Sequence, residues 1–263
     1  MSDSVFAGSP FLRESAAVDD RAAGARAGLR ARHDRAATDV RSAGRADDED
    51  GLLDATRRLE QVLAAARRDL GPADPDTLVV EGSLAVAYLL GDDETRGLGL
   101  ASRNLASRER AFGPDHPASL AAADAVAAAH RITGRPEEAV TRHEDVVTRR
   151  CRVLGDAHPC TVASRAALAQ ARGETGDLRG AAVLLSSTLD TADRFLGAAH
   201  PVTMDVRELL AECLDAQRRG ELAARARADD TELLPLVPAP DRREQRRRRP
   251  FFDRPSGPLP AVS

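Results

Sequence analysis

The residues best suited to chemistry in this chain of 263 residues are three cysteines and six histidines. Cys151, His158 and Cys160 stand close together, and these are residue types that bind zinc. Their spacing matches no zinc-binding pattern and a fourth ligand is missing, so we expect no metal site. An odd, sparse set of cysteines, with no apolar signal segment in the first twenty residues, predicts a reducing, cytoplasmic setting.

The histidines do not form a catalytic constellation. His116, His158 and His200 recur at a constant spacing of 42 residues, which indicates a structural motif and not a unique reactive site. The other three histidines have no partner pattern of Ser, Cys or Asp around them. The chain also lacks a glycine-rich phosphate loop, a nucleophile elbow and a metalloprotease helix motif. We therefore expect no enzymatic activity and no cofactor.

The motif that contains these histidines organises the chain. It consists of a large apolar residue, Gly, two further residues, His or Asp, Pro, any residue, and Thr or Ser before another apolar residue. Its four copies are marked by Gly71, Gly113, Gly155 and Gly197, again at a spacing of 42 residues. Internal repeats of this length are typical of solenoid proteins.

Each copy of the motif predicts the end of one helix and the start of the next. Gly is the usual left-handed residue after a helix, and Pro is favoured in the first turn. The Asp or His before Pro is expected to cap the new helix, and the Thr or Ser to bond to free N–H groups of its first turn. We call the helix after each Pro helix A and the helix before each Gly helix B.

Helix A carries an apolar stripe that keeps the same register in every copy. Two aligned sets define it: Leu84, Val126, Leu168 and Leu210, and next to them Ala85, Ala127, Ala169 and Ala211. The alanines predict close contact between helices, because a larger residue there would overpack the interface at a cost of about 1–3 kcal/mol.

These features resemble the tetratricopeptide repeat in its 42-residue form, known from kinesin light chains and from many bacterial multi-repeat proteins. The Leu-Ala pairs, small residues early in helix B such as Ala139 and Ala181, and the Leu-Gly-x-x-His-Pro-x-Thr junction carry the resemblance, over about residues 50 to 217. It implies an all-α fold, a right-handed α-solenoid of antiparallel helical hairpins. About three full repeats, at 74–112, 116–154 and 158–196, would be flanked by partial capping repeats.

The chain divides into three parts on this basis. Residues 1–48 are rich in Ala, Arg and Asp without a sustained apolar stripe, and we expect a disordered or weakly helical tail there. Residues 49–234 form the solenoid, beginning with a helix over 51–70 and ending with a helix A over 201–217 and a polar helix B over 220–234. Residues 235–263 are rich in Pro and Arg and are expected to be disordered. No apolar run is long enough to span a membrane.

The resemblance implies that a partner binds in the groove lined by helices A. The groove positions nominate eight residues: Val86, Leu89, Asp124, Arg131, Gln170, Glu208, Glu212 and Asp215. The groove would run from apolar to acidic, which favours a ligand with an apolar part and a basic part. The alternative is that the acidic residues are ordinary solvated helix residues. No Asn precedes the Leu-Ala pairs, where related repeats often clamp a peptide backbone.

The densest positive charge lies near the C-terminus and comprises Arg242, Arg243, Arg246, Arg247, Arg248 and Arg249. This run could contact phosphates of nucleic acid or of a membrane, keep the tail solvated, or fold back on the acidic end of the groove. We favour the solvated tail. The sequence thus predicts a non-catalytic scaffold that binds a protein or peptide. The alternative is a regulatory or nucleic-acid-associated protein that uses its Arg-rich tail.

Overall fold

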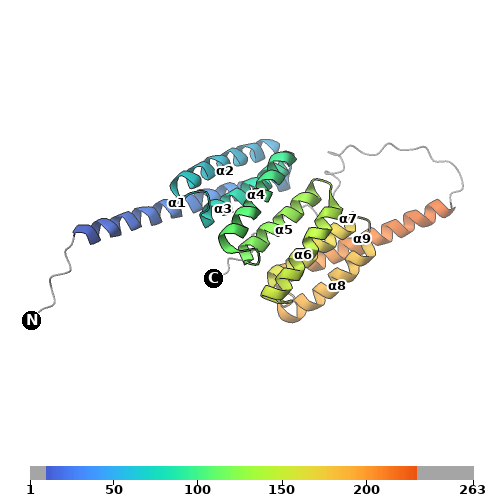
Figure 1. Cartoon of the computed structure of the whole chain (residues 1–263). Coiled ribbons are helices and arrows are strands. Elements are labelled where there is room, and N and C mark those ends of the chain that lie inside the picture. Colours follow the sequence, from blue (N-terminus) through green and yellow to red (C-terminus); the bar gives the residue numbers. More distant parts are fainter. Residues whose placement is uncertain (1–9, 230–263) are drawn as a thin grey trace, which may run out of the picture. The chain divides into compact units, whose positions relative to one another are not determined.

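The computed structural model describes the backbone of residues 10–229, and side chains from residue 23 to residue 222 except residue 45. Within this part the chain is entirely helical and contains no strand (Figure 1). The helices are α1 (Pro10–Ala46), α2 (Glu49–Asp69), α3 (Pro75–Leu90), α4 (Glu94–Phe112), α5 (Pro117–Ile132), α6 (Pro136–Leu154), α7 (Pro159–Glu174), α8 (Leu178–Phe195) and α9 (Pro201–Asp229). The pairs α3–α4, α5–α6 and α7–α8 occupy the three predicted hairpin segments.

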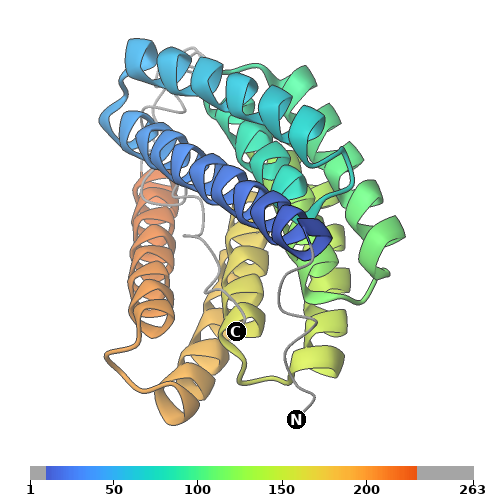
Figure 2. The same ribbon diagram turned by 90° about the vertical axis from the view of Figure 1, so that its left-hand side faces the viewer.

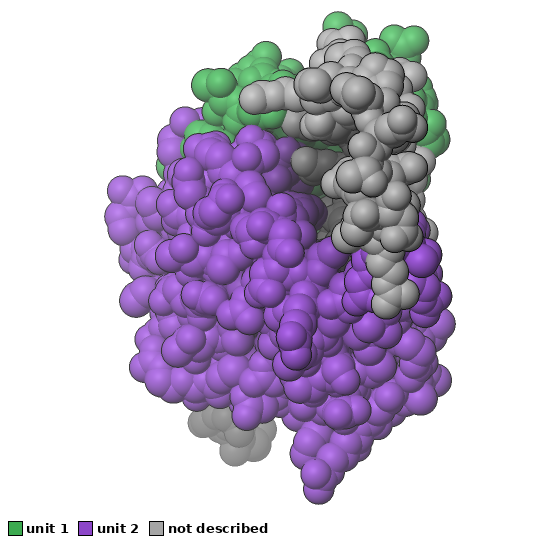
Figure 3. Space-filling model, turned by 90° about the vertical axis from the view of Figure 1, so that its right-hand side faces the viewer, with its two compact units in different colours: residues 1–100 green, residues 101–263 purple. Residues whose placement is uncertain are grey.

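The chain folds into two compact units, residues 1–100 and 101–263 (Figure 3). Unit 1 contains α1 to α3, with α1 against α2 and α3. Unit 2 contains α5 to α9, in which each helix packs on the next. The boundary falls within α4. Consecutive helices in contact are the arrangement of an α-solenoid, as the repeat pattern predicts.

The repeated junction forms as the sequence predicts at its glycine and at its cap. Gly71, Gly113, Gly155 and Gly197 all have φ near +90°, where a residue with a Cβ would be strained. The Asp or His side chain before each Pro accepts a hydrogen bond from the backbone N–H two residues on. For His158 this bond joins Nδ1 to the amide of Cys160 over 3.1 Å.

The predicted role of the Thr and Ser hydroxyls in the junction is wrong. The Oγ atoms of Thr77, Ser119, Thr161 and Thr203 are buried and form no hydrogen bond with any described residue. In the second and third copies of the junction, the backbone N–H of the Ser or Thr already donates to the carbonyl of the capping His. Ser119 donates to His116 in this way, and Thr161 to His158. The side chain of the capping His accepts a hydrogen bond from the backbone N–H of the residue before this Ser or Thr. Both amides are therefore satisfied without the hydroxyl.

Most of the N-terminal segment predicted as a disordered or weakly helical tail belongs to helix α1. Helix α1 lies alongside α2 (Figures 1 and 2) and buries a stripe formed by Leu29, Ala36, Ala37, Val40 and Ala43. The stripe is mostly alanine, which is why the sequence gives only a weak amphipathic signal. Ion pairs add to the contact, since Arg26 and Arg30 bind carboxylates at the N-terminus of α3. Such pairs, formed across some 50 residues of chain, are visible only in the tertiary structure.

The C-terminal hairpin also differs from the prediction. Helix α9 runs without a break from Pro201 to Asp229, and no separate helix B begins at residue 220. The earlier turns between helix A and helix B contain a residue with positive φ, namely Asp92, Gly134 or Gly176. The same position in the fourth copy is Arg218, which is poorly suited to a left-handed conformation. The helix therefore continues through the place where the chain would otherwise turn.

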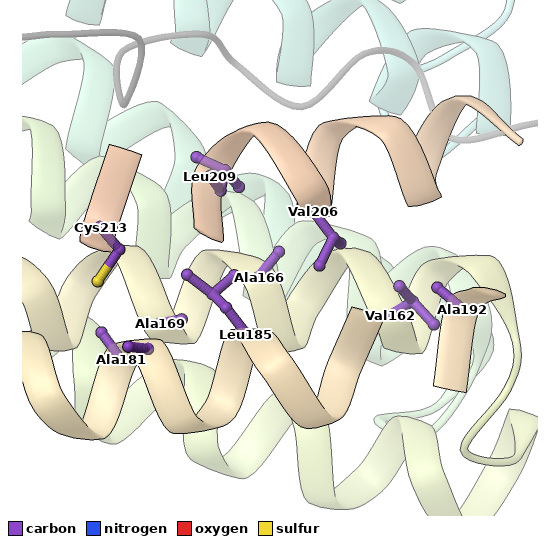
Figure 4. Close-up of a cluster of buried hydrophobic side chains, with 10 residues drawn as sticks. Val162, Ala166, Ala169, Ala181, Leu185, Ala192, Val206, Leu209 and Cys213 are labelled. Carbon is purple, nitrogen blue, oxygen red and sulfur yellow. The ribbon is translucent and has the colours of Figure 1, made fainter. Parts of the chain in front are cut away.

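The core of unit 2 lies where α9 crosses α7 and α8. Val206, Leu209 and Cys213 of α9 point toward Ala166 of α7 and Leu185 of α8, as Figure 4 shows. The aligned alanines Ala85, Ala127 and Ala169 are at most 2% exposed, which confirms the close contacts predicted for them. The fourth, Ala211, is exposed instead.

Candidate functional site

A pocket of about 420 Å³ opens in unit 2 between the end of α5, the turn into α6, and helices α7, α8 and α9. Its lining is Arg131, Gly134, Pro136, Ala169, Gln170, Gly173, Glu174, Leu178, Ala181, Leu185 and Cys213. These residues come from three successive repeats, so the pocket exists only because the repeats stack. Concave, mostly apolar pockets with a few polar groups are the usual form of a binding site.

Small residues leave the space that forms the apolar part of the pocket. Ala169 of α7 and Ala181 of α8 face it, and Gly173 has no side chain at all. A Cβ added at Gly173 would lie 3.7 Å from Leu178 and 4.0 Å from Ala181, which is ordinary van der Waals contact. A Cβ at residue 173 is therefore tolerated, and a larger side chain there would take up space of the pocket.

An ion pair between neighbouring repeats forms the polar wall of the pocket. Nη1 of Arg131 donates a hydrogen bond to Oε1 of Glu174 over 2.7 Å, and the two side chains are 6% and 23% exposed. A charge-assisted hydrogen bond in this partly buried setting fixes both side chains. Gln170, one turn before Glu174 on α7, supplies a neutral amide at the same wall.

The structure brings together only part of the predicted groove. Arg131 and Gln170 both line the pocket. Val86 and Leu89 lie on α3 in unit 1, and Leu89 is buried, so it is not a groove residue. Its side chain packs over Gly97, where an added Cβ would come within 2.6 Å of Leu89 Cγ.

The three predicted acidic residues of α9 lie outside the lining of the pocket. Glu208 and Asp215 are exposed, and Glu212 is half-buried between them. Their spacings of four and three residues place all three carboxylates on one side of the helix. Asp215 also pairs with Arg218 at 3.3 Å. The Arg-rich segment predicted as a second binding element, residues 242–249, lies outside the described residues.

Asp124 does not face a groove but anchors a buried polar network. Its Oδ1 lies 2.8 Å from His143 Nδ1, and its Oδ2 accepts hydrogen bonds from Arg150 at 3.0 Å and Ser164 at 2.9 Å. Arg150 also donates to the carbonyl of Cys160 and is only 1% exposed. The network joins α5, α6 and α7. The interpretation of Asp124 as a partner-binding residue is thus incorrect, because its carboxylate is used inside the stack.

The partners of Asp124 lower the pKa of its carboxyl group. Desolvation alone would raise this pKa, but the hydrogen bond with His143, the positive charge of Arg150 and the Ser164 hydroxyl together outweigh it. The carboxylate is therefore charged at neutral pH and compensates the guanidinium of Arg150. Ser164 bonds to the carboxylate and not to the imidazole, so this Asp, His and Ser do not form the relay of a hydrolase.

The thiols show no sign of activation. Desolvation is the main cause that raises the pKa of Cys151, Cys160 and Cys213, so all three remain protonated at neutral pH. Cys213 lines the pocket, where its thiol bonds to the carbonyl of Leu178 at 3.4 Å. Among the described residues, no group of three or more His, Cys, Asp or Glu side chains is placed to hold a metal ion. No helix of the described part has the length and apolar character to cross a membrane.

A second hollow of about 400 Å³ lies between α4, α5 and α6, but charged side chains dominate its lining. Arg149 on its wall already pairs with Asp145 and Asp115, at 3.1 and 3.0 Å. Charges that satisfy one another leave less for a ligand to bind. The pocket between α5 and α9 is therefore the better candidate.

His130, the residue before Arg131, makes the stability of this region sensitive to pH. It is buried, and Oε2 of Glu138 lies 3.0 Å from its Nδ1 without forming a hydrogen bond. Desolvation, followed by the charges of Arg142 and Arg135, lowers the pKa of His130 despite the opposing effect of Glu138. The unfolded chain then binds a proton below about pH 6.5 more readily than the folded chain.

We therefore expect the free energy of unfolding to fall as the pH decreases below about 6.5, with a slope of at most about 1.4 kcal/mol per pH unit from this residue. The loss ends once the pH passes below the folded-state pKa of His130. His130→Gln should remove this component while keeping a neutral polar side chain. Urea titrations of both proteins at several pH values test this, and identical pH profiles for the two would contradict it.

Comparison with known proteins agrees with these features. The tetratricopeptide repeat family matches residues 119–159, which span α5, α6 and the following junction. A crystal structure of kinesin-light-chain-like repeats from Podosopora anserina, described as putative kinesin light chain nearly identical TPR-like repeats, is 27% identical. Its TM-score is 0.57, and the match covers 77% of this chain and 95% of that one. The crystal structure of a point variant of the same repeats gives a TM-score of 0.58 at the same identity, covering 77% and 94%.

Residues 119–159 thus match the tetratricopeptide repeat, and the fold of the chain is similar to that of kinesin-light-chain-like repeats. Its all-α fold and 42-residue hairpins are those of this repeat, as the junction motif predicts. A search among curated proteins found no match. The similarity to tetratricopeptide repeats therefore rests on the repeat motif and on the fold.

Sequence reasoning found only part of this pocket, because five of its eleven lining residues come from outside the helices A. Leu178, Ala181 and Leu185 belong to helix B of the third repeat. A usable signal was the separation of Arg131 and Glu174, which is close to the repeat length. Residues one repeat apart stack in a solenoid, so opposite charges at that separation are candidates for an ion pair.

Proposed function

We propose that this protein acts as a non-catalytic scaffold that binds a protein partner at the pocket between α5 and α9. Tetratricopeptide repeats in general support protein-interaction scaffolds, and the pocket adds a specific place for contact. The observation that carries the proposal is the pocket itself: an apolar floor, left open by Ala169, Gly173 and Ala181, beside the Arg131–Glu174 pair.

The chemistry of the site suggests the kind of segment that binds. The apolar floor favours a side chain of the size of Leu or Met, because burial of that side chain supplies most of the binding free energy. The carboxylates of Glu208, Glu212 and Asp215 on one side of α9 favour a basic residue elsewhere in the same segment. The proposed ligand is thus a peptide segment with an apolar anchor in the pocket and, further along the segment, an Arg or Lys that reaches these carboxylates.

The test is a selection of peptides from a displayed random library on the full chain, followed by affinity measurements on variants. Gly173→Leu should fill the pocket and weaken the selected peptides by at least about tenfold, or about 1.4 kcal/mol. The substitution also favours helix, so the fold is retained. Gly28→Leu is the matched control, since Gly28 lies in helix α1 with no atom within 4 Å of an added Cβ. Equal affinity for the wild-type and Gly173→Leu proteins would contradict the assignment of the pocket.

A further inference from the structure

One side of α9 is bare where the equivalent side of every earlier helix A is covered. Leu78, Leu120 and Val162 occupy the same repeat position and are at most 1% exposed, whereas Met204 is 55% exposed. The alanine seven residues later shows the same contrast, because Ala211 alone of its set is exposed. The repeat thus provides an internal standard, and by that standard α9 lacks a neighbour in the described part of the chain.

The missing neighbour is a helix B. Each earlier helix A is followed by a helix that turns back along it, whereas α9 continues through Arg218 to Asp229. The opposite side of α9 is fully used, since Val206, Leu209 and Cys213 pack on α7 and α8 (Figure 4). Within the described residues no helix follows α9. The bare side therefore keeps the character of a helix-packing surface without its partner.

The bare side extends along most of α9. Met204, Ala211, Leu214 and Leu222 are spaced by seven, three and eight residues, which places them on one side of the helix. Leu214 and Leu222 are 45% and 57% exposed. With the small Ala211 near its middle, this surface allows close approach of a second helix. We call these four residues the α9 face.

We propose that the α9 face pairs with the α9 face of a second copy of this chain, with the two helices antiparallel. Helix B runs antiparallel to its helix A, so the C-terminal half of α9 from the second copy takes the place of the missing helix B. Each copy makes the same contact with the other, so the two chains form a closed two-fold dimer, the commonest symmetric assembly. Burial of Met204, Leu214 and Leu222 supplies the driving force.

The charges beside the face favour this occupant and this direction. Arg207 and Asp215 lie four residues before and four residues after Ala211. An antiparallel pair centred on Ala211 places Arg207 opposite Asp215 of the second copy, and does so twice. A parallel pair would place Arg207 opposite Arg207 and Asp215 opposite Asp215. Such charge complementarity sets the orientation of the two helices more than their affinity. Within one chain, Arg207 already pairs with Asp193 and Asp215 with Arg218, both at exposed positions.

The experiment measures the molecular mass of the full chain by light scattering and sedimentation equilibrium over a range of micromolar concentrations. The wild-type protein should be a dimer, and Ala211→Glu should weaken the dimer by at least about a hundredfold, because it buries two like charges at the centre of the contact. Ala125→Glu is the matched control, since Ala125 is an exposed alanine of α5. Circular dichroism checks that both variants remain folded.

Charge exchange then tests the direction. Arg207→Asp and Asp215→Arg should each weaken the dimer at low salt, and the double variant should recover the wild-type dissociation constant. A wild-type chain that is monomeric throughout this range would overturn the proposal and leave the α9 face to another protein or to residues 230–263. A dimer that tolerates Ala211→Glu would also overturn it, and a double variant no better than the single ones would exclude the antiparallel pairing.

Discussion

Asp124→Ala is expected to lower the free energy of unfolding by about 3–5 kcal/mol, because it leaves the buried guanidinium of Arg150 without its compensating charge. The variant also removes the acceptor for His143 and Ser164. Urea denaturation followed by circular dichroism measures the effect. Asp193→Ala is the control, since Asp193 forms an exposed pair with Arg207 and its loss should cost less than about 1 kcal/mol.

The destabilisation by Asp124→Ala should depend on the buried charge and on pH. Arg150→Met in the Asp124→Ala background removes the uncompensated charge and should recover part of the lost stability. Because the folded-state pKa of Asp124 is lowered, its contribution is fully present above the unfolded pKa of about 3.9 and is lost as the pH falls through the lower folded value. If Asp124→Ala and Asp193→Ala cost the same at neutral pH, the network does not support the stack.

Ala169→Leu is expected to lower the free energy of unfolding by about 1–3 kcal/mol, whereas Ala211→Leu should not lower it at all. The two alanines hold the same position in neighbouring repeats. Ala169 is 1% exposed and packs in the core of unit 2 beside the pocket, and Ala211 lies on the α9 face. Extra methylene groups force displacement only at the buried site.

Chemical denaturation of Ala169→Leu and Ala211→Leu under identical conditions provides the comparison. Equal losses in the two variants would show that Ala211 is covered inside each chain, and no loss in either would mean that the register of helix A is misassigned. The pair also separates repeat packing from self-association, since only Ala211→Leu changes the α9 face.

The pocket and the α9 face lie on different sides of α9, and Asp215 is the one residue that both the proposed peptide site and the proposed dimer use. The pocket needs Cys213 and the side of α9 that packs on α7 and α8, whereas the dimer needs Met204 and Ala211. Gly173→Leu and Ala211→Glu therefore act on separate functions. A partner bound in the pocket could be presented twice by one dimer, which would raise the avidity for a partner that carries two such segments.

The sequence alone determined the helices of the three hairpins between residues 74 and 196, their order and their ends. These features depend on interactions between residues a few positions apart: the His158 side chain capping an amide two residues on, and the glycine at residue 155 adopting positive φ. Local hydrogen bonds and backbone sterics are readable wherever the residue types recur. The constant 42-residue spacing added the stacking of neighbours and hence the solenoid.

Only the tertiary structure decided which copies of a repeated position are covered and which side chains turn inward. Ala169 and Ala211 are indistinguishable in the repeat pattern, yet only one has a helix packed over it. Asp124 occupies a groove position by alignment, but Arg150 and Ser164, from two other helices, hold it inside the stack. The weak alanine stripe of α1 likewise becomes a buried surface because α2 and α3 lie against it. Burial depends on neighbours that are distant in sequence, and no local pattern contains that information.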